Sequence, residues 1–367
     1  MKQSDLFRSR TGIFILLAIA AVMVIGVVYL AGGSGEAPEV VSEDTPETVE
    51  APPSPVSESP ASPVSPDSSL PAATPTASLP AQEAEAMLES GLRLYEAGQY
   101  EAAVTVLNDV LAQEPENALA YNARGSAYTD LGEYERALED YNRAIERMPN
   151  FPHAYYNRGR VYSLLGESDQ ALADLQTSVE LAPTEFGYRA NGNIGLIYHQ
   201  MGEYDQALEA FATAISYDNT KADTYFYRGE TYLAMEDYDA AIENYRSAIE
   251  RFPRYPQAYR SLGFTAYKTG DYEAAAEALD QARALNPDDP IAGLYLAMVQ
   301  LASGDPDQAE QELAQAVESL DVVAETDREA LVSRVRAELQ TFAEENPDQA
   351  GQVERLAELL PAGDEAQ

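Results

Sequence analysis

The chain has 367 residues, a formal net charge of −39 and no cysteine. Without thiols it has no disulfide, no thiolate zinc site and no cysteine nucleophile. Because 62 acidic residues outnumber 23 basic ones, the protein should repel a phosphate backbone, so we expect no nucleic-acid partner. The acidity suits protein partners with basic patches, and it equally suits a surface that charge keeps soluble and monomeric.

Residues 11–32 form the first predicted element, a transmembrane helix. No residue from Thr11 to Leu30 is charged, and about 20 apolar residues are enough to cross the hydrocarbon core. The preceding residues include Lys2, Arg8 and Arg10. Under the positive-inside rule, residues 1–10 are cytoplasmic and the rest of this single-pass cell-membrane protein is extracytoplasmic, in a periplasm or outside the cell. We expect an uncleaved signal anchor, with a cleaved signal peptide as the alternative.

Residues 33–82 are predicted to be a disordered linker. This stretch is rich in Pro, Ser, Ala and Glu, and it contains no basic residue. Such a composition buries too little apolar surface to offset chain entropy, and its like charges repel one another. The linker should therefore act as a tether that holds the following part away from the membrane.

From residue 84 onward the sequence repeats itself at intervals of 34 residues, with one step of 36. The turn position of each unit is occupied by Gly98, Gly132, Gly166, Gly202, Glu236 and Gly270. A second glycine lies seven residues earlier, at Gly91, Gly125, Gly159, Gly195, Gly229 and Gly263. An alanine lies five residues later, at Ala103, Ala137, Ala171, Ala207, Ala241 and Ala275. Small residues at fixed spacing are expected where two helices cross closely.

The second unit shows the fullest pattern: Tyr121, Gly125, Tyr128, Gly132, Tyr134, Ala137, Tyr141, Ala144 and Pro149. This pattern resembles the tetratricopeptide repeat (TPR) family. The resemblance implies an all-α fold, a right-handed superhelical solenoid of helix-turn-helix hairpins over residues 84–320. The transmembrane helix and the disordered Pro-rich linker would precede it.

The predicted units start near residues 84, 118, 152, 188, 222 and 256, with a degenerate seventh near 290. The two extra residues fall near 184–187, where we expect a change of superhelical pitch. Residues 321–367 should form capping helices, because Leu331, Val335 and Leu339 recur at helical spacing. Solenoids need such helices to cover the apolar face of the last repeat.

The sequence offers little chemistry for catalysis. The two histidines, His153 and His199, occupy different phases of their units, so we expect no metal site and no cofactor. The glycines follow the repeat and form no phosphate-binding loop. We therefore predict that the protein is not an enzyme.

The resemblance implies that the first helix of each hairpin lines a concave groove. The predicted partner-binding residues are Tyr95, Asn122, Tyr156, Arg160, Arg189, His199, Phe226, Arg260, Phe264, Tyr267 and Lys268. This set is more apolar and more positive than the rest of the chain, which suits a protein or peptide with apolar anchors and some negative charge. The alternative is that the aromatic residues pack between repeats and the arginines pair with glutamates.

Arg124, Arg158 and Arg228 recur at one phase, and we interpret them as structural. Some members of the family hold a carboxylate with Lys and Asn residues; here Arg189 with Asn193, and His153 with Asn157, match only part of that spacing.

The predicted function is that of a membrane-tethered scaffold or adaptor that binds a protein or peptide in this groove outside the cytoplasm. A structural, self-associating envelope spacer is the alternative, and an accessory domain of an envelope enzyme system is a third. The oligomeric state does not follow from the sequence.

Overall fold

A computed structural model describes residues 81–287, 289–322 and 325–361. The predicted cytoplasmic segment 1–10, the transmembrane segment 11–32 and linker residues 33–80 lie outside the described residues. The predicted linker is two residues too long, because α2 (Ala81–Glu96) already includes residues 81 and 82. No helix in the described part is both long and apolar enough to cross a membrane.

In the described part, fourteen helices pair into seven hairpins, and no residue there forms a β-strand. With α2, the first helices are α4 (Ala118–Asp130), α6 (Pro152–Leu164), α8 (Pro183–Gln200), α10 (Ala222–Ala234), α12 (Pro256–Lys268) and α14 (Pro290–Ala302). The second helices are α3 (Tyr100–Gln113), α5 (Tyr134–Arg147), α7 (Ser168–Leu181), α9 (Tyr204–Tyr217), α11 (Tyr238–Arg251), α13 (Tyr272–Leu285) and α15 (Pro306–Glu318).

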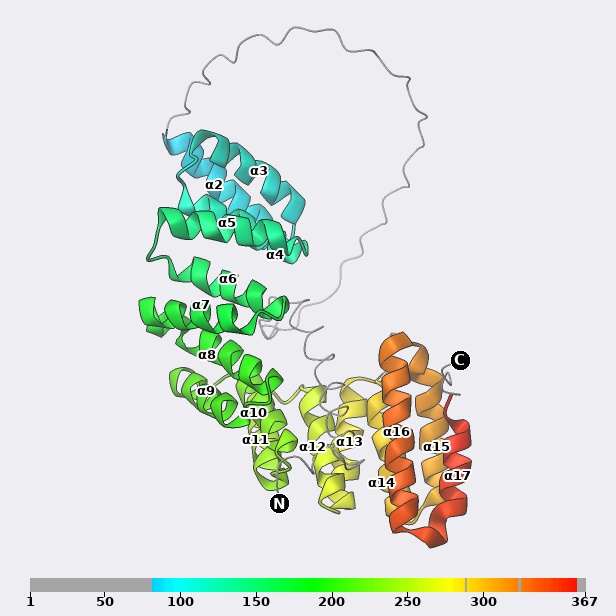
Figure 1. Cartoon of the computed structure of the whole chain (residues 1–367). Helices are drawn as coiled ribbons and strands as arrows, with labels where there is room; N and C mark the ends of the chain where they lie inside the picture. The colour runs from blue at the N-terminus through cyan, green and yellow to red at the C-terminus, as the bar shows by residue number, and fades with distance from the viewer. Residues whose placement is uncertain (1–80, 288, 323–324, 362–367) are drawn as a thin grey trace, which may run out of the picture.

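The hairpins stack in chain order. Each second helix packs against the first helix of the next hairpin, and each first helix also contacts the next first helix from α2 through to α14. Figure 1 shows the stack running from α2 to α11 and then turning aside through α12 to α17. The first helices therefore form a continuous row along one side of the array.

A left-handed residue closes most hairpins. At Gly132, φ is +76°, its N–H donates to Thr129 O at 3.0 Å, and the Glu133 N–H donates to Tyr128 O at 2.8 Å. This is the Schellman arrangement, which satisfies carbonyl groups at a helix end. Unit five forms the same turn with Glu236 at φ +61°, although a side chain disfavours this conformation.

Close crossings explain the second glycine and the alanine of each unit. A Cβ atom on Gly125 would lie 2.8 Å from the Tyr141 ring, and one on Gly195 would lie 2.6 Å from the Phe211 ring. Ala137 is fully buried in the same crossing. Because these positions have no room for a larger group, the spacing of small residues sets how the two helices of a hairpin meet.

The two extra residues of unit four lengthen a helix. The α8 helix has 18 residues where α6 has 13, and it begins at Pro183 instead of near residue 188. Residues 184–187 therefore form the first turn of α8, and Gly187 lies directly against the Tyr217 ring. Pro183 starts this helix and does not close the preceding unit, because proline suits the first turn, where an N–H is not needed.

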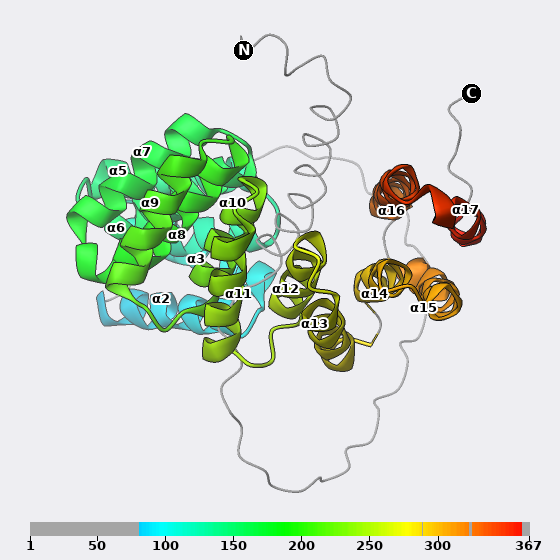
Figure 2. The same ribbon diagram turned by 90° about the horizontal axis from the view of Figure 1, so that it is seen from below.

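Two C-terminal helices cover the last hairpin. These are α16 (Glu325–Glu345) and α17 (Ala350–Leu359), with short 3-10 turns η2 (Ser319–Val322) and η3 (Pro347–Gln349) before each. Their apolar residues share one core with α14 and α15: Leu331, Val332, Val335, Leu339, Phe342, Val353, Leu356 and Leu360. Figures 1 and 2 both place α16 beside α14. The C-terminal helices thus bury the apolar surface that the last hairpin would otherwise expose.

Candidate functional site

Charge is divided unequally between the two sides of the hairpins. The five first helices from α4 to α12 carry seven Arg and Lys against four Asp and Glu. The five second helices from α5 to α13 carry six against fifteen. We call the surface made by side chains of the first helices the first-helix face. In a chain with a net charge of −39, this face is the less negative side of the array.

Side chains on successive first helices bond to one another. The bonds run from Asn157 Nδ2 to Asn122 Oδ1 (3.1 Å), from Asn193 Nδ2 to Tyr156 Oη (3.3 Å), and between His199 Nδ1 and Thr231 Oγ1 (3.0 Å). Sequence reasoning named Asn157 and Asn193 only as partial matches to a carboxylate-holding pair and did not identify Thr231, because the bonds that connect the helices join residues more than 30 positions apart. The first-helix face is therefore a connected polar and aromatic surface.

The Tyr156 site is the part of this face with the most unused binding groups; we define it as Tyr156, Arg160, Phe186, Arg189 and Asn193. The Tyr156 and Phe186 rings lie 5.0 Å apart, and the Arg160 guanidinium carbon is 5.9 Å from the Tyr156 ring centre. Asn193 joins α8 to α6 through its bond to Tyr156, and its amide also donates to the Arg189 carbonyl oxygen within α8 at 2.9 Å. Neither arginine forms an ion pair with any residue that the structure describes.

His153 borders the Tyr156 site. Its Nε2 lies 2.9 Å from Glu185 Oε1, and its ring meets Phe186 edge-on at 5.0 Å. Glu185 is the only carboxylate on α8. With this carboxylate already engaged by His153, the arginines of the site are positioned to meet an external anion.

At the N-terminal end of the face, Tyr95 packs 5.6 Å from Tyr100 and hydrogen-bonds Asp130. Burial, reinforced by Asp130, raises the pKa of the Tyr95 hydroxyl well above its usual value. Tyr95 is therefore a neutral, half-buried ring. It lies near the Tyr156 site, since the charge of Arg160 acts to lower the pKa of Tyr95.

His199 and Phe226 are taken up by packing between repeats. Burial lowers the pKa of His199 to about 4, so the ring is neutral near pH 7. The Phe226 ring lies 5.3 Å from Tyr227 and 5.1 Å from Tyr255. Their predicted contact with a partner stays a prediction, and the contacts seen here match the alternative of packing between repeats.

Two predicted cations of unit six form ion pairs with residues that follow them in the chain. Arg260 Nη1 lies 2.5 Å from Asp289 Oδ2, directly before α14 of the seventh hairpin. Lys268 Nζ lies 2.8 Å from Glu338 Oε2 on α16. Sequence reasoning missed both carboxylates, and for Glu338 nothing in the repeat pattern tells how far α16 folds back along the array.

Aromatic residues in the same place are also covered. Phe264 is 8% exposed and packs 4.8 Å from Tyr295 of α14, while Tyr267 is half-buried beside Tyr272. Arg334 of α16 lies over both the Phe264 and the Tyr295 rings, at 5.1 and 5.7 Å. This end of the first-helix face is closed by the chain itself.

A buried carboxyl lies next to this closed end. Glu230 of α10 is 9% exposed and accepts a hydrogen bond from Tyr245 Oη at 2.7 Å. Burial raises the pKa of Glu230, and the bond from Tyr245 with the charges of Arg260 and Arg334 acts in the opposite direction. The α16 helix thus contributes one of the cations that offset a buried charge.

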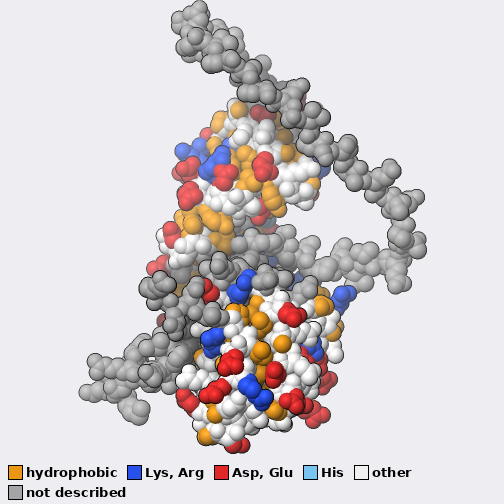
Figure 3. Space-filling view, turned by 90° about the vertical axis from the view of Figure 1, so that its right-hand side faces the viewer, with side chains coloured by type: hydrophobic (Ala, Val, Ile, Leu, Met, Phe, Trp, Pro, Cys, Tyr) orange, Lys and Arg blue, Asp and Glu red, His pale blue; other side chains and the backbone are white. Residues whose placement is uncertain are grey.

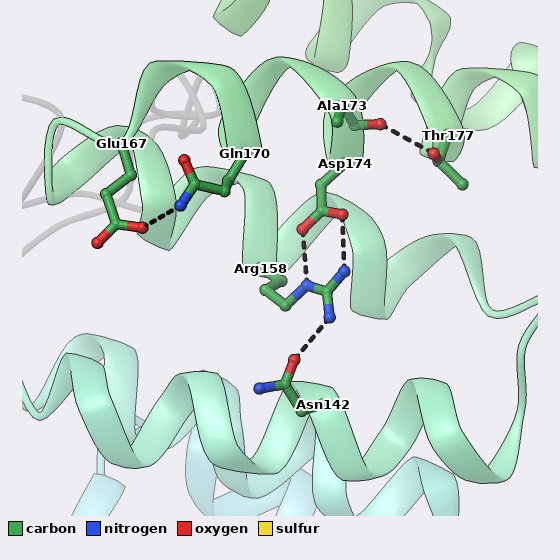
Figure 4. Close-up of polar contacts among 7 residues, drawn as sticks. All are labelled: Asn142, Arg158, Glu167, Gln170, Ala173, Asp174 and Thr177. Atoms are coloured by element: carbon green, nitrogen blue, oxygen red, sulfur yellow. Dashed lines mark hydrogen bonds and ion pairs between the residues drawn. The ribbon is translucent and has the colours of Figure 1, made fainter.

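The recurring arginines are structural, as the sequence predicts. Arg158 donates to both oxygens of Asp174, at 2.7 and 2.8 Å, and to Asn142 Oδ1 of the preceding unit at 2.6 Å, as Figure 4 shows. Arg124 makes the equivalent contacts with Asp140 and Asn108. Each of these arginines ties three helices together with three of its five N–H donors.

Among the described residues, no group of three or more His, Asp or Glu side chains could hold a metal ion. Many of the described acidic residues lie on the second helices, and others form ion pairs with arginine.

Comparison with known proteins places these hairpins in a family. Residues 91–130 and 125–166 match the model of the TPR repeat. These residues are tetratricopeptide repeats. Residues 158–321 also match the C-terminal TPR domain of cilia and flagella-associated protein 70. No curated protein matches the chain. TPR arrays commonly serve as protein–protein interaction scaffolds.

Solved structures show the same fold. A TPR protein from Parabacteroides merdae is 21% identical, with a TM-score of 0.53, and the match covers 69% of this chain and 99% of that one. Pseudomonas aeruginosa pilF is 21% identical, with a TM-score of 0.52, covering 60% and 98%. A chain of the APC/C hetero-tetramer Cut9–Hcn1 is 20% identical, with a TM-score of 0.52. That match covers 66% of this chain and 47% of the other, so the match spans about half the length of that protein.

Proposed function

We propose that this TPR array is a scaffold that binds a protein or peptide partner on its first-helix face, at the Tyr156 site, and that it carries out no catalysis. The observation that carries the proposal is a pair of arginines on neighbouring first helices, Arg160 and Arg189, that form no ion pair with any described residue. Arg160 lies beside the half-buried Tyr156 ring, which packs on the buried Phe186 ring, and Arg189 lies one helical turn before Asn193, which bonds to Tyr156. The Tyr156 ring can take an apolar anchor, and the guanidinium groups can bind a carboxylate. The partner segment should therefore carry an apolar side chain next to Asp, Glu or a chain-terminal carboxylate.

The charge distribution supports the same proposal. A negatively charged segment approaching the second helices meets fifteen carboxylates from α5 to α13, whereas the first helices from α4 to α12 present four. Long-range repulsion keeps a negatively charged partner away from the second helices, and the arginines of the Tyr156 site attract it to the first-helix face. This difference orients the partner before contact.

A capture experiment tests the proposal. The full chain, tagged and held in mild detergent, is incubated with an envelope extract, and retained proteins are identified by mass spectrometry. The affinity of a purified partner is then measured for Arg160→Glu with Arg189→Glu. We expect affinity to fall at least about tenfold, which corresponds to roughly 1.4 kcal/mol, and wild-type binding to weaken with added salt.

Arg143→Glu with Arg246→Glu is the matched control. These two arginines are exposed on second helices, and their replacement changes the net charge by the same amount. Equal losses in both pairs would attribute binding to net charge and would refute the Tyr156 site as the place of binding.

We also propose that residues 11–32 anchor the chain in the membrane and that residues 33–80 tether the array outside the cytoplasm. The uncharged stretch from Thr11 to Leu30 and the basic residues before it support this arrangement. Because the chain has no cysteine, a single Ser57→Cys can be labelled with a membrane-impermeant maleimide in intact cells, with Ser4→Cys as the control. Labelling of Ser4→Cys and not of Ser57→Cys would show the opposite topology and would contradict the proposal.

The spacer alternative predicts self-association. Sedimentation of the purified protein over a hundredfold concentration range distinguishes the two functions, because a scaffold for another protein stays monomeric while a spacer assembles.

A further inference from the structure

The α16 helix lies across the first-helix face and does not simply extend the stack. Its Glu338 carboxylate contacts Lys268 Nζ through both oxygens, at 2.8 and 2.9 Å, and its Arg334 lies over Phe264 and Tyr295. Lys268 and Phe264 belong to α12, one full unit before the hairpin that α16 covers. A helix that only capped the last hairpin would need no contact with α12.

Two stripes of α16 are used for this docking. An apolar stripe that includes Leu331, Val335 and Leu339 enters the core formed with α14, α15 and α17. A charged stripe of Arg334 and Glu338, one helical turn apart, faces α12. An amphipathic helix that inserts apolar residues and pairs its flanking charges is a common way for a helical ligand to occupy a groove.

The covered surface has the same chemistry as the open one. Under α16, the Phe264 and Tyr295 rings lie 4.8 Å apart with Lys268 beside them, 5.5 Å from the Phe264 ring. In the Tyr156 site, the half-buried Tyr156 ring also lies beside a cation, Arg160, and packs on a buried ring, Phe186. The first-helix face therefore has a similar arrangement of rings and a cation near α6 and α8, and at α12 and α14 this arrangement is covered by α16.

The α16 helix comes after the seven hairpins in the chain. It follows α15 through η2, so its release would expose apolar residues of the last hairpin but would interrupt none of the hairpins that precede it. Its contacts with α12 are made by charged groups, which salt and competing charges weaken. Figure 3, viewed from the side on which α15 to α17 lie in Figure 1, shows basic and acidic side chains interspersed with apolar ones over this end of the molecule.

We propose that α16 is a displaceable intramolecular ligand that closes the α12–α14 part of the first-helix face, and that its release opens a second docking surface for a helix. The competing helix carries apolar residues every three or four positions with an arginine one turn before a glutamate, as α16 does. The inference goes beyond binding at the Tyr156 site and does not depend on it, because it concerns the array without any partner.

Hydrogen exchange of the full chain tests whether α16 opens by itself. We expect the amides of α16 to exchange faster than those of α14 and α15 in the wild type, and Glu338→Lys to raise the α16 rates by a further factor of roughly five to ten without changing α4 to α11. The double variant Lys268→Glu with Glu338→Lys should restore protection. Glu344→Lys, on the exposed side of α16, is the matched control and should change nothing.

A peptide added in trans tests whether the surface takes a helix. The probe is a labelled synthetic peptide of residues 325–345, and we expect it to bind the Glu338→Lys protein at least about tenfold more tightly than the wild type, in which α16 occupies the site. Exchange of α16 at the same rate as α14 and α15 would overturn the inference, as would equal binding of the peptide to both proteins or no binding to either. Binding of partners at the Tyr156 site is measured separately with Arg160→Glu, so failure of one proposal leaves the other standing.

Discussion

Arg228 on α10 donates a hydrogen bond to Asn244 on α11 at 2.7 Å, in the position where units two and three place an arginine against an aspartate. Burial lowers the pKa of Arg228, whereas hydrogen bonding to Asp174 raises that of Arg158 despite burial. The fifth unit thus keeps a half-buried cation without the carboxylate that stabilises its counterparts.

We predict that Asn244→Asp stabilises the protein by about 1 kcal/mol at pH 7, because the new carboxylate accepts two charge-assisted bonds from a guanidinium that is already buried. Urea denaturation measures the change, and the gain should disappear at a pH low enough to protonate the new side chain. The mirror change, Asp174→Asn, converts unit three to the contact of unit five and should destabilise it. A loss of stability in Asn244→Asp would contradict the prediction.

Removing the acceptor altogether should cost more. Asp174→Ala leaves Arg158 with Asn142 as its remaining polar partner, and an uncompensated buried charge costs about 3 to 5 kcal/mol. Denaturation midpoints measure this loss. Asp169→Ala, an exposed aspartate on the same helix, is the control and should change stability by less than about 0.5 kcal/mol.

The repeat pattern predicted the hairpins because each signal has a local physical cause. Gly132 marks a left-handed turn, and Gly125 with Ala137 marks a close crossing, so both can be recognised from spacing alone. The first turn of α8 was less predictable, because a two-residue insertion can lengthen a loop or a helix and only packing of Gly187 on Tyr217 decides between them.

The turn of unit five offers a second test of stability. Glu236 adopts φ +61°, a conformation that costs a residue with a side chain about 1 to 2 kcal/mol. We predict that Glu236→Gly raises the free energy of unfolding by about 0.5 to 1 kcal/mol, the strain relieved less the larger entropy of an unfolded glycine. Thermal or urea denaturation checks it. Gly202→Glu makes the opposite change at the same position of unit four and should lower stability; a rise would show that the turn tolerates side chains.

The candidate site was predictable only in part. Tyr156, Arg160 and Arg189 follow from the positions of the repeat, and in the structure Tyr156 bonds to Asn193, one turn after Arg189, and lies beside Arg160. The ion pair of Lys268 does not follow from the repeat, since its partner Glu338 lies 70 residues away on a helix outside the repeat. Contacts between the array and a non-repeating segment have no periodic signal in the sequence.

His199 should make stability depend on pH. Its folded pKa is lowered to about 4 by burial, whereas the pKa of an unfolded histidine is about 6.5. Between these values the unfolded chain binds a proton that the folded one does not, so stability is fully present above about pH 6.5 and falls as the pH drops towards 4. The loss is at most on the order of 3 kcal/mol. Urea denaturation at pH 7, 5.5 and 4.5 measures it.

Two variants separate His199 from the carboxylates that also titrate in acid. His199→Gln keeps a polar side chain next to Thr231 but cannot take up a proton near pH 6, so its stability should fall less between pH 7 and 4.5 than that of the wild type. His153→Gln removes the exposed histidine beside Glu185 and should leave the pH dependence of the wild type largely intact. If His199→Gln and the wild type lose stability in parallel, the folded ring takes up its proton over the same pH range as the unfolded one, and burial does not lower the pKa of His199.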